Sequence, residues 1–172
     1  MRITNLSPPP VSPVSESEAK TFLRVDHDHE DALISNLITA ATTHVETILA
    51  GAILARPMRL ETNVPELGII PIPRHPVKSV EAVRAGEPLI DVDFTANVRP
   101  RPAQVNVSGH LGDPIEIDFT AGFGDTPADV PTPIRQAVLL LVAQLYEHRD
   151  GPTPPTPMMV DALLSPYRGV RL

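Results

Sequence analysis

The sequence has 172 residues, a net charge of −7 and no cysteine. This length favours one domain with a substantial core over two independent domains. The acidic balance argues against a protein that coats nucleic acid or an anionic membrane, and the lack of cysteine excludes disulfides, thiolate metal sites and cysteine nucleophiles. Four Phe, two Tyr and no Trp stand beside 21 prolines, so we expect a core of Leu, Ile, Val and Ala.

The N-terminal region is predicted to be extended at first and then helical. Residues 1–14 contain four prolines and are expected to be extended and exposed. They lack the apolar core of a signal peptide, so we expect the protein to be made in the cytoplasm. Ser15 and Glu18 have the spacing of a capping box, which predicts a short helix that ends near Arg24.

The next stretch, from Asp28 to Ala50, is predicted to be an amphipathic helix with one apolar face. Its apolar residues recur at steps of three and four, namely Leu33, Ile34, Leu37, Ile38, Ala41, Val45, Ile48 and Leu49. We expect Gly51 to cap the C-terminus of this helix. The residues expected in the core are Leu33, Leu37, Ala41 and Val45.

The middle of the chain is predicted to form short strands, because β-branched or alternating runs are separated there by Pro and Gly. The predicted strands are Arg59–Val64, Ile69–Ile72, Val77–Arg84, Leu89–Phe94, Gln104–Val107 and Ile115–Ala121. Turns are expected at residues 85–88 and 109–114, and residues 99–102 are expected to form an exposed loop. The alternation in the last run places Ile115, Ile117 and Phe119 on one face.

A long apolar helix is predicted from Pro131 to Arg149, with Thr132 as N-cap and Pro133 at the first helical position. All residues from 137 to 143 are apolar, so this helix should be covered on nearly all sides, by its own chain or by a neighbouring subunit. The apolar run is shorter than the ~20 residues that span a bilayer. The residues expected in its core or interface are Ile134, Val138, Leu141 and Leu145.

The predicted fold class is therefore α+β. Amphipathic N-terminal helices and a long buried C-terminal helix would pack around a small antiparallel sheet or sandwich, with extended termini. We expect an extended proline-rich segment over residues 1–14, a domain over residues 15–151, and a proline spacer with a C-terminal arm over residues 152–172.

Residue patterns typical of catalysis or metal binding are weak in this sequence. His27 and His29 lie among aspartates, but an i, i+2 pair at a helix start diverges, and acidic residues are expected there on electrostatic grounds. Residues 120–124 resemble a phosphate-binding loop only faintly, since they lack a third glycine and a lysine. We assign no catalytic, cofactor-binding or metal-ligating residue.

Three stretches together resemble a known family. They are the amphipathic residues 31–54, the strand pair IPIPRHPVKSVEAV at residues 70–83, and residues 119–150, which contain TAGFG, VPTPIRQA and YEHR. They are similar to the head–tail connector (adaptor) proteins of long-tailed bacteriophages, including those of prophages and gene transfer agents. The resemblance extends from about residue 15 over most of the chain.

The resemblance implies a structural subunit without enzymatic activity or cofactor. Such a subunit would belong to a dodecameric ring in the neck of a virion or gene transfer agent particle assembled in bacteria. The implied partners are other copies of the chain, the portal protein, and a stopper or tail-terminator protein. Double-stranded DNA would pass through the ring without specific binding, and no membrane partner is implied.

By analogy with this family, residues 158–172 are predicted to be a portal-contacting arm. The residues expected to carry the contact are Met158, Met159, Leu163, Leu164, Tyr167, Arg168, Val170, Arg171 and Leu172. One alternative is a monomeric tail-completion or binding module without a portal contact. Another is a hydrolase, whose activity would depend on His27 and His29.

Overall fold

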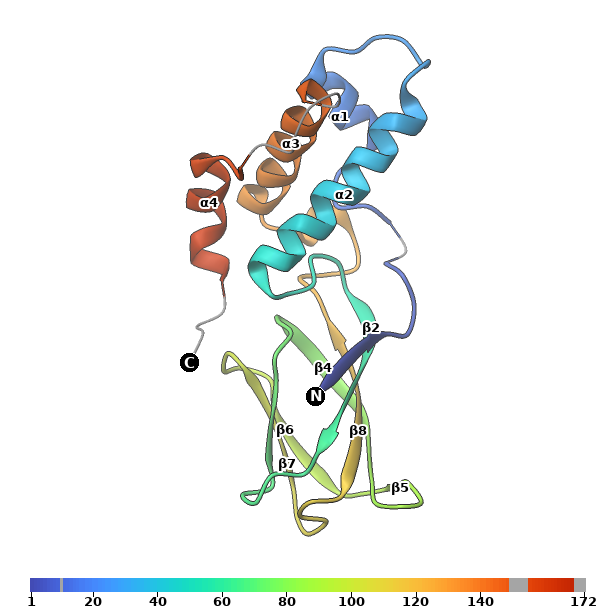
Figure 1. The fold of residues 1–172 in the computed structure, drawn as a ribbon, viewed down its shortest axis with the longest axis vertical. Coiled ribbons are helices and arrows are strands. Elements are labelled where there is room, and N and C mark those ends of the chain that lie inside the picture. The colour runs from blue at the N-terminus through green and yellow to red at the C-terminus, as the bar shows by residue number, and fades with distance from the viewer. Residues whose placement is uncertain (10, 149–154, 169–172) are drawn as a thin grey trace. The chain divides into compact units, whose positions relative to one another are not determined.

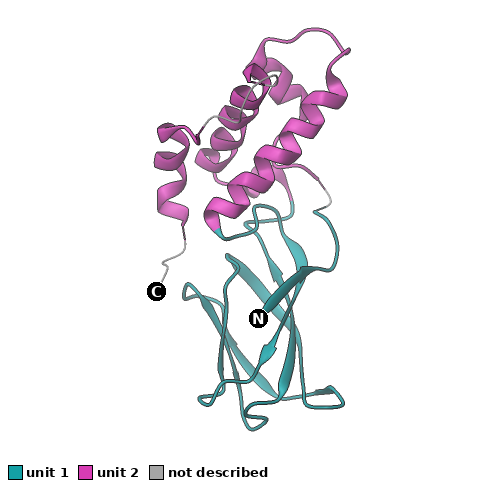
Figure 2. Cartoon of the chain, viewed as in Figure 1, with its two compact units in different colours: residues 1–9, 50–125, 169–172 teal, residues 10–49, 126–168 magenta. Residues whose placement is uncertain are grey.

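The computed structural model describes residues 1–9, 11–148 and 155–168. These residues form four α-helices and two antiparallel sheets, so the α+β prediction is confirmed (Figure 1). They divide into two compact units (Figure 2). The β unit comprises residues 1–9 and 50–125, and the helical unit comprises residues 11–49, 126–148 and 155–168. The boundaries expected after residues 14 and 151 do not coincide with the boundaries of these units.

The first helix, α1 (Glu16–Leu23), begins as its sequence predicts. The Glu18 N–H donates to Ser15 Oγ at 3.1 Å, and the Ser15 N–H donates to Glu18 Oε2 at 2.9 Å. This reciprocal pair satisfies two backbone donors that a helix start leaves without partners. Arg24 ends the helix in a left-handed conformation. The predicted capping box and short helix are therefore confirmed.

The second helix, α2 (Asp31–Leu49), packs against α1 and α3 in the helical unit. Its buried residues are Ile34, Ile38, Ala41, Val45 and Leu49. Leu33 and Leu37, which we expected in the core, are only half-buried. Ala41 and Val45 are buried as expected. In the first half of the helix, Ile34 and Ile38 fit the same spacing of three and four residues, and packing against the neighbouring helices buries them instead of Leu33 and Leu37.

The end of α2 corrects the role expected for Gly51. Ala50, and not Gly51, takes the left-handed conformation after the helix, with φ of 50°. Gly51 is instead required by a close approach, because a Cβ there would lie 2.4 Å from the carbonyl oxygen of His75. The Ala52 N–H donates to the same oxygen at 3.1 Å.

The third helix, α3 (Thr132–Glu147), has Pro131 as its N-cap, so the assignment of Thr132 as N-cap is wrong by one residue. The side chains from residue 133 to 146 are all buried or half-buried, in agreement with the apolar run. The buried residues are Ile134, Ala137, Val138, Leu141 and Val142. Leu145 is only half-buried, so its predicted burial is wrong. Helices α1, α2 and α4 of the same chain provide the cover.

The fourth helix, α4 (Met158–Leu164), packs on α3, and a 3-10 turn at Ser165–Tyr167 follows it. The sequence predicted a stiff spacer before it and an open tail after it. In the described part of the spacer, Pro155 O accepts a hydrogen bond from Gln144 Nε2 at 2.9 Å. Thr156 Oγ1 lies 2.9 Å from His44 Nε2. These contacts hold residues 155–156 of the predicted spacer against α2 and α3.

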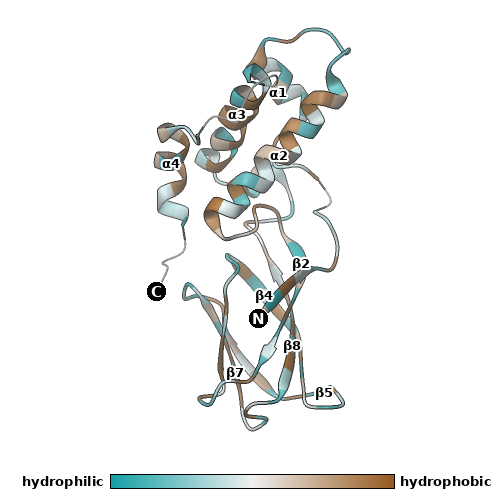
Figure 3. Ribbon diagram, in the orientation of Figure 1, coloured by the Kyte–Doolittle hydropathy of each residue, from teal (hydrophilic) through white to brown (hydrophobic). Residues whose placement is uncertain are grey.

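The β unit contains two antiparallel sheets. The five-stranded sheet has the order β1-β2-β8-β4-β5, and the three-stranded sheet has the order β3-β7-β6. The strands are β1 (Arg2–Asn5), β2 (Arg56–Asn63), β3 (Ile69–Ile72), β4 (Val77–Ala85), β5 (Ile90–Asp91), β6 (Phe94–Asn97), β7 (Ala103–Val107) and β8 (Pro114–Ala121). Hydrophobic and hydrophilic residues alternate along β7 and β8 (Figure 3), and Ile115, Ile117 and Phe119 are buried as expected.

Two parts of this unit differ from the sequence prediction. Residues 89–94 are not one strand, because β5 pairs with β4 in the first sheet whereas β6 pairs with β7 in the second. Residues 1–14 are not all exposed, because β1 pairs with β2, and Pro13 and Val14 are buried. The partner of β1 lies more than fifty residues away, so local patterns could not identify it. β5 and β6 pair with neighbouring strands, but these strands belong to different sheets.

Gly122 provides a test of the packing at the end of β8. Its φ is +142°, and a Cβ there would lie 2.3 Å from Ala55 N and 2.4 Å from Leu54 C. Both atoms are backbone, so relief requires the chain to move. We expect Gly122→Ala to lower the free energy of unfolding by roughly 3 kcal/mol, measured by urea denaturation.

Gly109→Ala is the matched control. Gly109 also has positive φ, at +79°, but a Cβ there would meet nothing within 4 Å. The control should cost only about 1 kcal/mol, the conformational penalty alone. Equal losses in the two variants would contradict the packing argument.

Candidate assembly surfaces

The histidines considered for metal binding lie in the loop before α2. The rings of His27 and His29 are 5.7 Å apart, and His27 Nε2 is 3.9 Å from Glu30 Oε2. Glu30 Oε2 also accepts a hydrogen bond from the Tyr146 hydroxyl at 2.5 Å, which links this loop to α3. Within residues 1–9, 11–148 and 155–168, no group of three or more His, Asp or Glu side chains could hold a metal ion.

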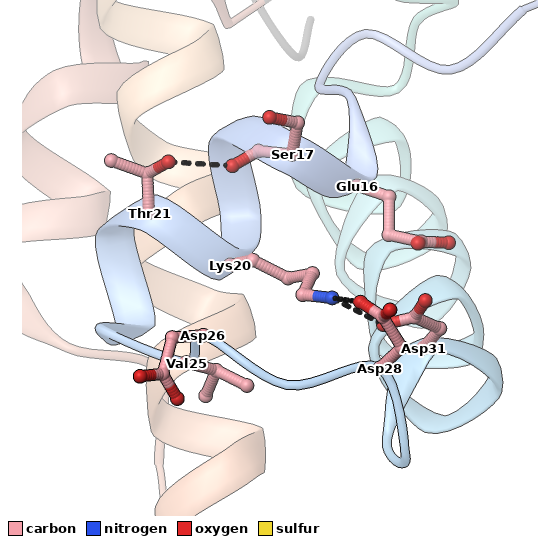
Figure 4. A pocket seen from close by; sticks show the side chains of 8 residues that line it. All are labelled: Glu16, Ser17, Lys20, Thr21, Val25, Asp26, Asp28 and Asp31. Carbon is pink, nitrogen blue, oxygen red and sulfur yellow. Dashed lines mark hydrogen bonds and ion pairs between the residues drawn. The ribbon is translucent and has the colours of Figure 1, made fainter.

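A pocket of about 330 Å³ lies beside α1 and the start of α2 (Figure 4). Lys20 Nζ extends across it to Asp28 Oδ1 at 2.6 Å and to Asp31 Oδ1 at 2.7 Å. Its hydrogen bonds to Asp28 and then to Asp31 raise the pKa of Lys20, and Lys20 lowers the pKa of Asp28. Lys20 on α1 thus binds Asp28, in the loop before α2, and Asp31, at the start of α2. These ion pairs link the two helices, so the role of Lys20 is structural.

The outward-facing surface of the five-stranded sheet carries a network of four charges from β2, β4 and β8. Arg59 binds Asp118 through two hydrogen bonds, Nε–Oδ1 at 2.7 Å and Nη2–Oδ2 at 3.0 Å. Arg84 Nη2 binds the same Oδ2 at 2.7 Å, and both arginines lie 3.3 Å from Glu116 Oε2. All four side chains are at most 30% exposed. The network links the side chains of three neighbouring strands across this surface of the sheet.

Asp118 makes this network sensitive to acid. The hydrogen bonds from Arg59, and then those from Arg84, lower the pKa of Asp118 below its ordinary value of 3.8, while partial burial opposes them. A pKa lowered by folding adds stability above the ordinary value and loses it as the pH falls through the folded value. We expect Asp118→Asn to reduce the free energy of unfolding at pH 7 by about 1–3 kcal/mol. The deficit relative to wild type should shrink as the pH falls below about 4.

The control is Glu61→Gln on β2, whose partner Arg2 lies 3.9 Å away in an exposed pair. Such a pair contributes at most about 1 kcal/mol. Urea denaturation of the three proteins at pH 7 and at pH 3 provides the measurement. A deficit for Asp118→Asn that is the same at both pH values would contradict the assignment.

The part of the predicted C-terminal arm that forms α4 has an exposed face and a buried face. Met158 and Met159 are 89% and 63% exposed, whereas Val160 and Leu164 are fully buried. Leu163 and Tyr167 are half-buried, and exposed Arg168 pairs with Asp161. Val170, Arg171 and Leu172 lie outside the described residues. Among the described residues expected to contact the portal, Met158, Met159 and Arg168 are exposed, and Leu164 is buried against α3.

Exposed apolar side chains also occur on loops of the β unit, where sequence analysis proposed no site. Leu67, Leu89, Ile90 and Leu111 are all exposed. Each stands in or beside a turn rich in Gly, Pro and acidic residues. Isolated apolar residues next to Gly, Pro and acidic residues are the sequence signal that could have identified them.

Comparison with known proteins identifies a family and several solved structures that are similar to this chain. The profile of the phage gp6-like head–tail connector protein family matches residues 17–84. A chain from the neck of an empty gene transfer agent (GTA) particle, computed with C6 symmetry, is 29% identical at a TM-score of 0.84. The similarity covers 100% of this chain and 97% of that one. The chain is therefore similar to the phage gp6-like head–tail connector family over residues 17–84, and to a GTA neck chain over its whole length.

Two further structures are similar to this chain over its whole length. A chain of the virion of a native GTA particle is 28% identical, with a TM-score of 0.84. A chain of the neck of a native GTA particle, computed with C12 symmetry, is 28% identical, with a TM-score of 0.77. Each match covers 100% of this chain and 97% of the other chain. No curated protein sequence matches the chain.

These matches confirm the resemblance seen in the sequence and support a structural role in a particle neck rather than an enzymatic one. Across the parts of the chain that the structure describes, none of the helices combines the length and apolarity needed to cross a bilayer.

Proposed function

We propose that this chain is a head–tail connector, one subunit of a dodecameric ring in the neck of a phage or GTA particle, between the portal and the stopper or tail. The observation that carries this proposal is the full-length similarity to chains of GTA necks, one of them computed with C12 symmetry. A ring of twelve subunits is compatible with both the C12 and the C6 symmetry used for the related necks, whereas a ring of six subunits is compatible only with C6 symmetry. A head-to-tail contact that closes generates such a ring.

The charge of the chain suits a ring through which DNA passes. A net charge of −7 per subunit would surround the duplex with negative potential if the ring closes. Duplex DNA gains affinity for proteins mainly when Lys and Arg neutralise its phosphates. An acidic wall therefore lets DNA move without adhering to it.

The proposed portal contact lies on the outer face of α4. Met158 and Met159 are adjacent and exposed, while the opposite face of the helix is buried against α3. Methionine adapts its shape to irregular apolar surfaces, which suits docking into a partner's groove. In the alternative function, a monomeric tail-completion or binding module, this face would not contact a portal.

A particle-producing strain that lacks the connector gene tests the proposed role. We expect DNA-containing heads and free tails, with no joined particles, when lysates are viewed by electron microscopy. A plasmid copy of the wild-type gene should restore joined particles. Normal numbers of tailed particles in the deletion strain would contradict a neck function.

A further inference from the structure

Three loops meet at one end of the β unit, the lower end in Figure 1. They are the β2–β3 loop (residues 64–68), the β4–β5 loop (residues 86–89) and the β7–β8 loop (residues 108–113). Val64 and the β7–β8 loop exchange backbone hydrogen bonds, Val64 N to Asp113 O and Gly112 N to Val64 O, both at 2.9 Å. Gly86 N donates to Pro114 O at 3.0 Å. We call the surface formed by these loops and β5 the tip surface.

The tip surface displays large apolar side chains to solvent. Leu67 is 84% exposed, Leu111 57%, Ile90 53% and Leu89 40%. Loops are usually polar, and exposed apolar residues that gather on neighbouring loops mark an interaction site more often than scattered ones do. The hydrogen bonds between the loops hold these side chains in place before any partner arrives, which lowers the entropic cost of binding.

The charges around these apolar residues are mainly negative. The loops and the residues beside them carry Glu66, Glu87, Asp91, Asp93 and Asp113. Arg84, at the end of β4, is already bound to Glu116 and Asp118 on the outward-facing surface of the sheet. His110 Nδ1 lies 3.2 Å from Asp113 Oδ2, so the histidine is engaged within the surface. Such a surface repels DNA and also repels a second tip surface. It is complementary to an apolar contact face bordered by Lys and Arg.

We propose that the tip surface docks a second neck protein, different from the portal, whose contact face presents apolar side chains among Lys and Arg. This inference rests on the proposed function, because a connector between two different components needs two separate docking surfaces. The outer face of α4 takes the portal in that scheme. The tip surface belongs to the other compact unit and supplies the second contact.

Crosslinking tests which protein meets the tip surface, and the connector suits it because it contains no cysteine. Leu67→Cys and Leu111→Cys would each carry a benzophenone maleimide, and Thr95→Cys, on exposed β6, serves as the control. Each labelled protein is bound to its co-encoded portal and mixed with the purified co-encoded stopper protein. We expect the Leu67 and Leu111 positions to crosslink to the stopper and the Thr95 position not to do so.

Every other outcome overturns the proposal. Crosslinks from the tip positions to a second connector would make this surface a ring contact. Crosslinks to the portal would show that the tip surface contacts the portal rather than the stopper. The absence of crosslinks, or equal crosslinking from Thr95, would show that no specific docking occurs there.

A binding measurement adds an energetic test. Leu67→Ser combined with Leu111→Ser should weaken stopper binding to the portal-bound connector by at least about tenfold, because apolar contacts central to an interface carry much of its affinity. Leu6→Ser is the control, since Leu6 is 48% exposed in the same unit but lies outside the tip surface. Unchanged stopper affinity in the double variant would overturn the proposal.

Portal binding by the same proteins separates this inference from the proposed function. If the double variant and wild type bind the portal equally and the stopper equally, only the tip surface proposal fails. If wild type binds no portal, the proposed function itself fails.

Discussion

Leu141→Asp is expected to prevent the helical unit from folding. Leu141 is 4% exposed on the buried face of α3, where the cover comes from other helices of the same chain. The substitution removes an apolar side chain and buries a carboxylate without a partner, at a cost of roughly 4–5 kcal/mol or more. A domain is typically stable by only about 5–15 kcal/mol. Far-ultraviolet circular dichroism should show loss of helix, and thermal melting should show no cooperative transition from this unit.

Thr132→Asp is the matched control for this prediction. It places the same carboxylate in the same helix, but at its exposed first residue. Acidic side chains interact favourably with a helix N-terminus, so the melting temperature should stay at or slightly above that of wild type. If Leu141→Asp melted like wild type, α3 would not be the core of the helical unit.

Met158→Ser combined with Met159→Ser is expected to weaken portal binding by about 100-fold or more, if these adjacent residues anchor the arm as proposed. Both side chains are largely exposed, so their replacement removes no packing within the chain. Thermal melting should be unchanged. Binding to the co-encoded portal can be followed by biolayer interferometry.

Val160→Ser and Leu164→Ser provide the opposite control on the same helix. Both side chains are fully buried, so these variants should destabilise the helical unit. For the same reason, deletion of residues 158–172 should abolish portal binding and also uncover part of α3. Wild-type portal affinity in the double methionine variant would exclude the outer face of α4 as the portal contact.

The features that the sequence predicted well depend on neighbours within a few residues. The capping box of Ser15 and Glu18 and the alternation of Ile115, Ile117 and Phe119 each determine a local geometry, and both are present in the structure. The face of α2 was predicted less well, because Leu33 and Ile34 fit the same helical spacing. Only contact with α1 and α3 decides between them.

The features that the sequence could not predict depend on partners far along the chain. β1 pairs with β2, more than fifty residues away, so its short polar sequence gave no local signal of a strand. Arg59 and Asp118 meet because β2 and β8 pair in a particular register, and that register is set by the whole sheet. The tip surface likewise arises only when three separate turns reach the same end of the β unit.

The mass of the purified connector in solution, measured by light scattering alone and with its co-encoded portal, tests the central claim most directly. If the connector is a ring subunit, a species of twelve copies should appear, either free or bound to the portal as a corresponding increase in mass. A monomer under both conditions would contradict the ring and favour a tail-completion or binding module that acts without the portal.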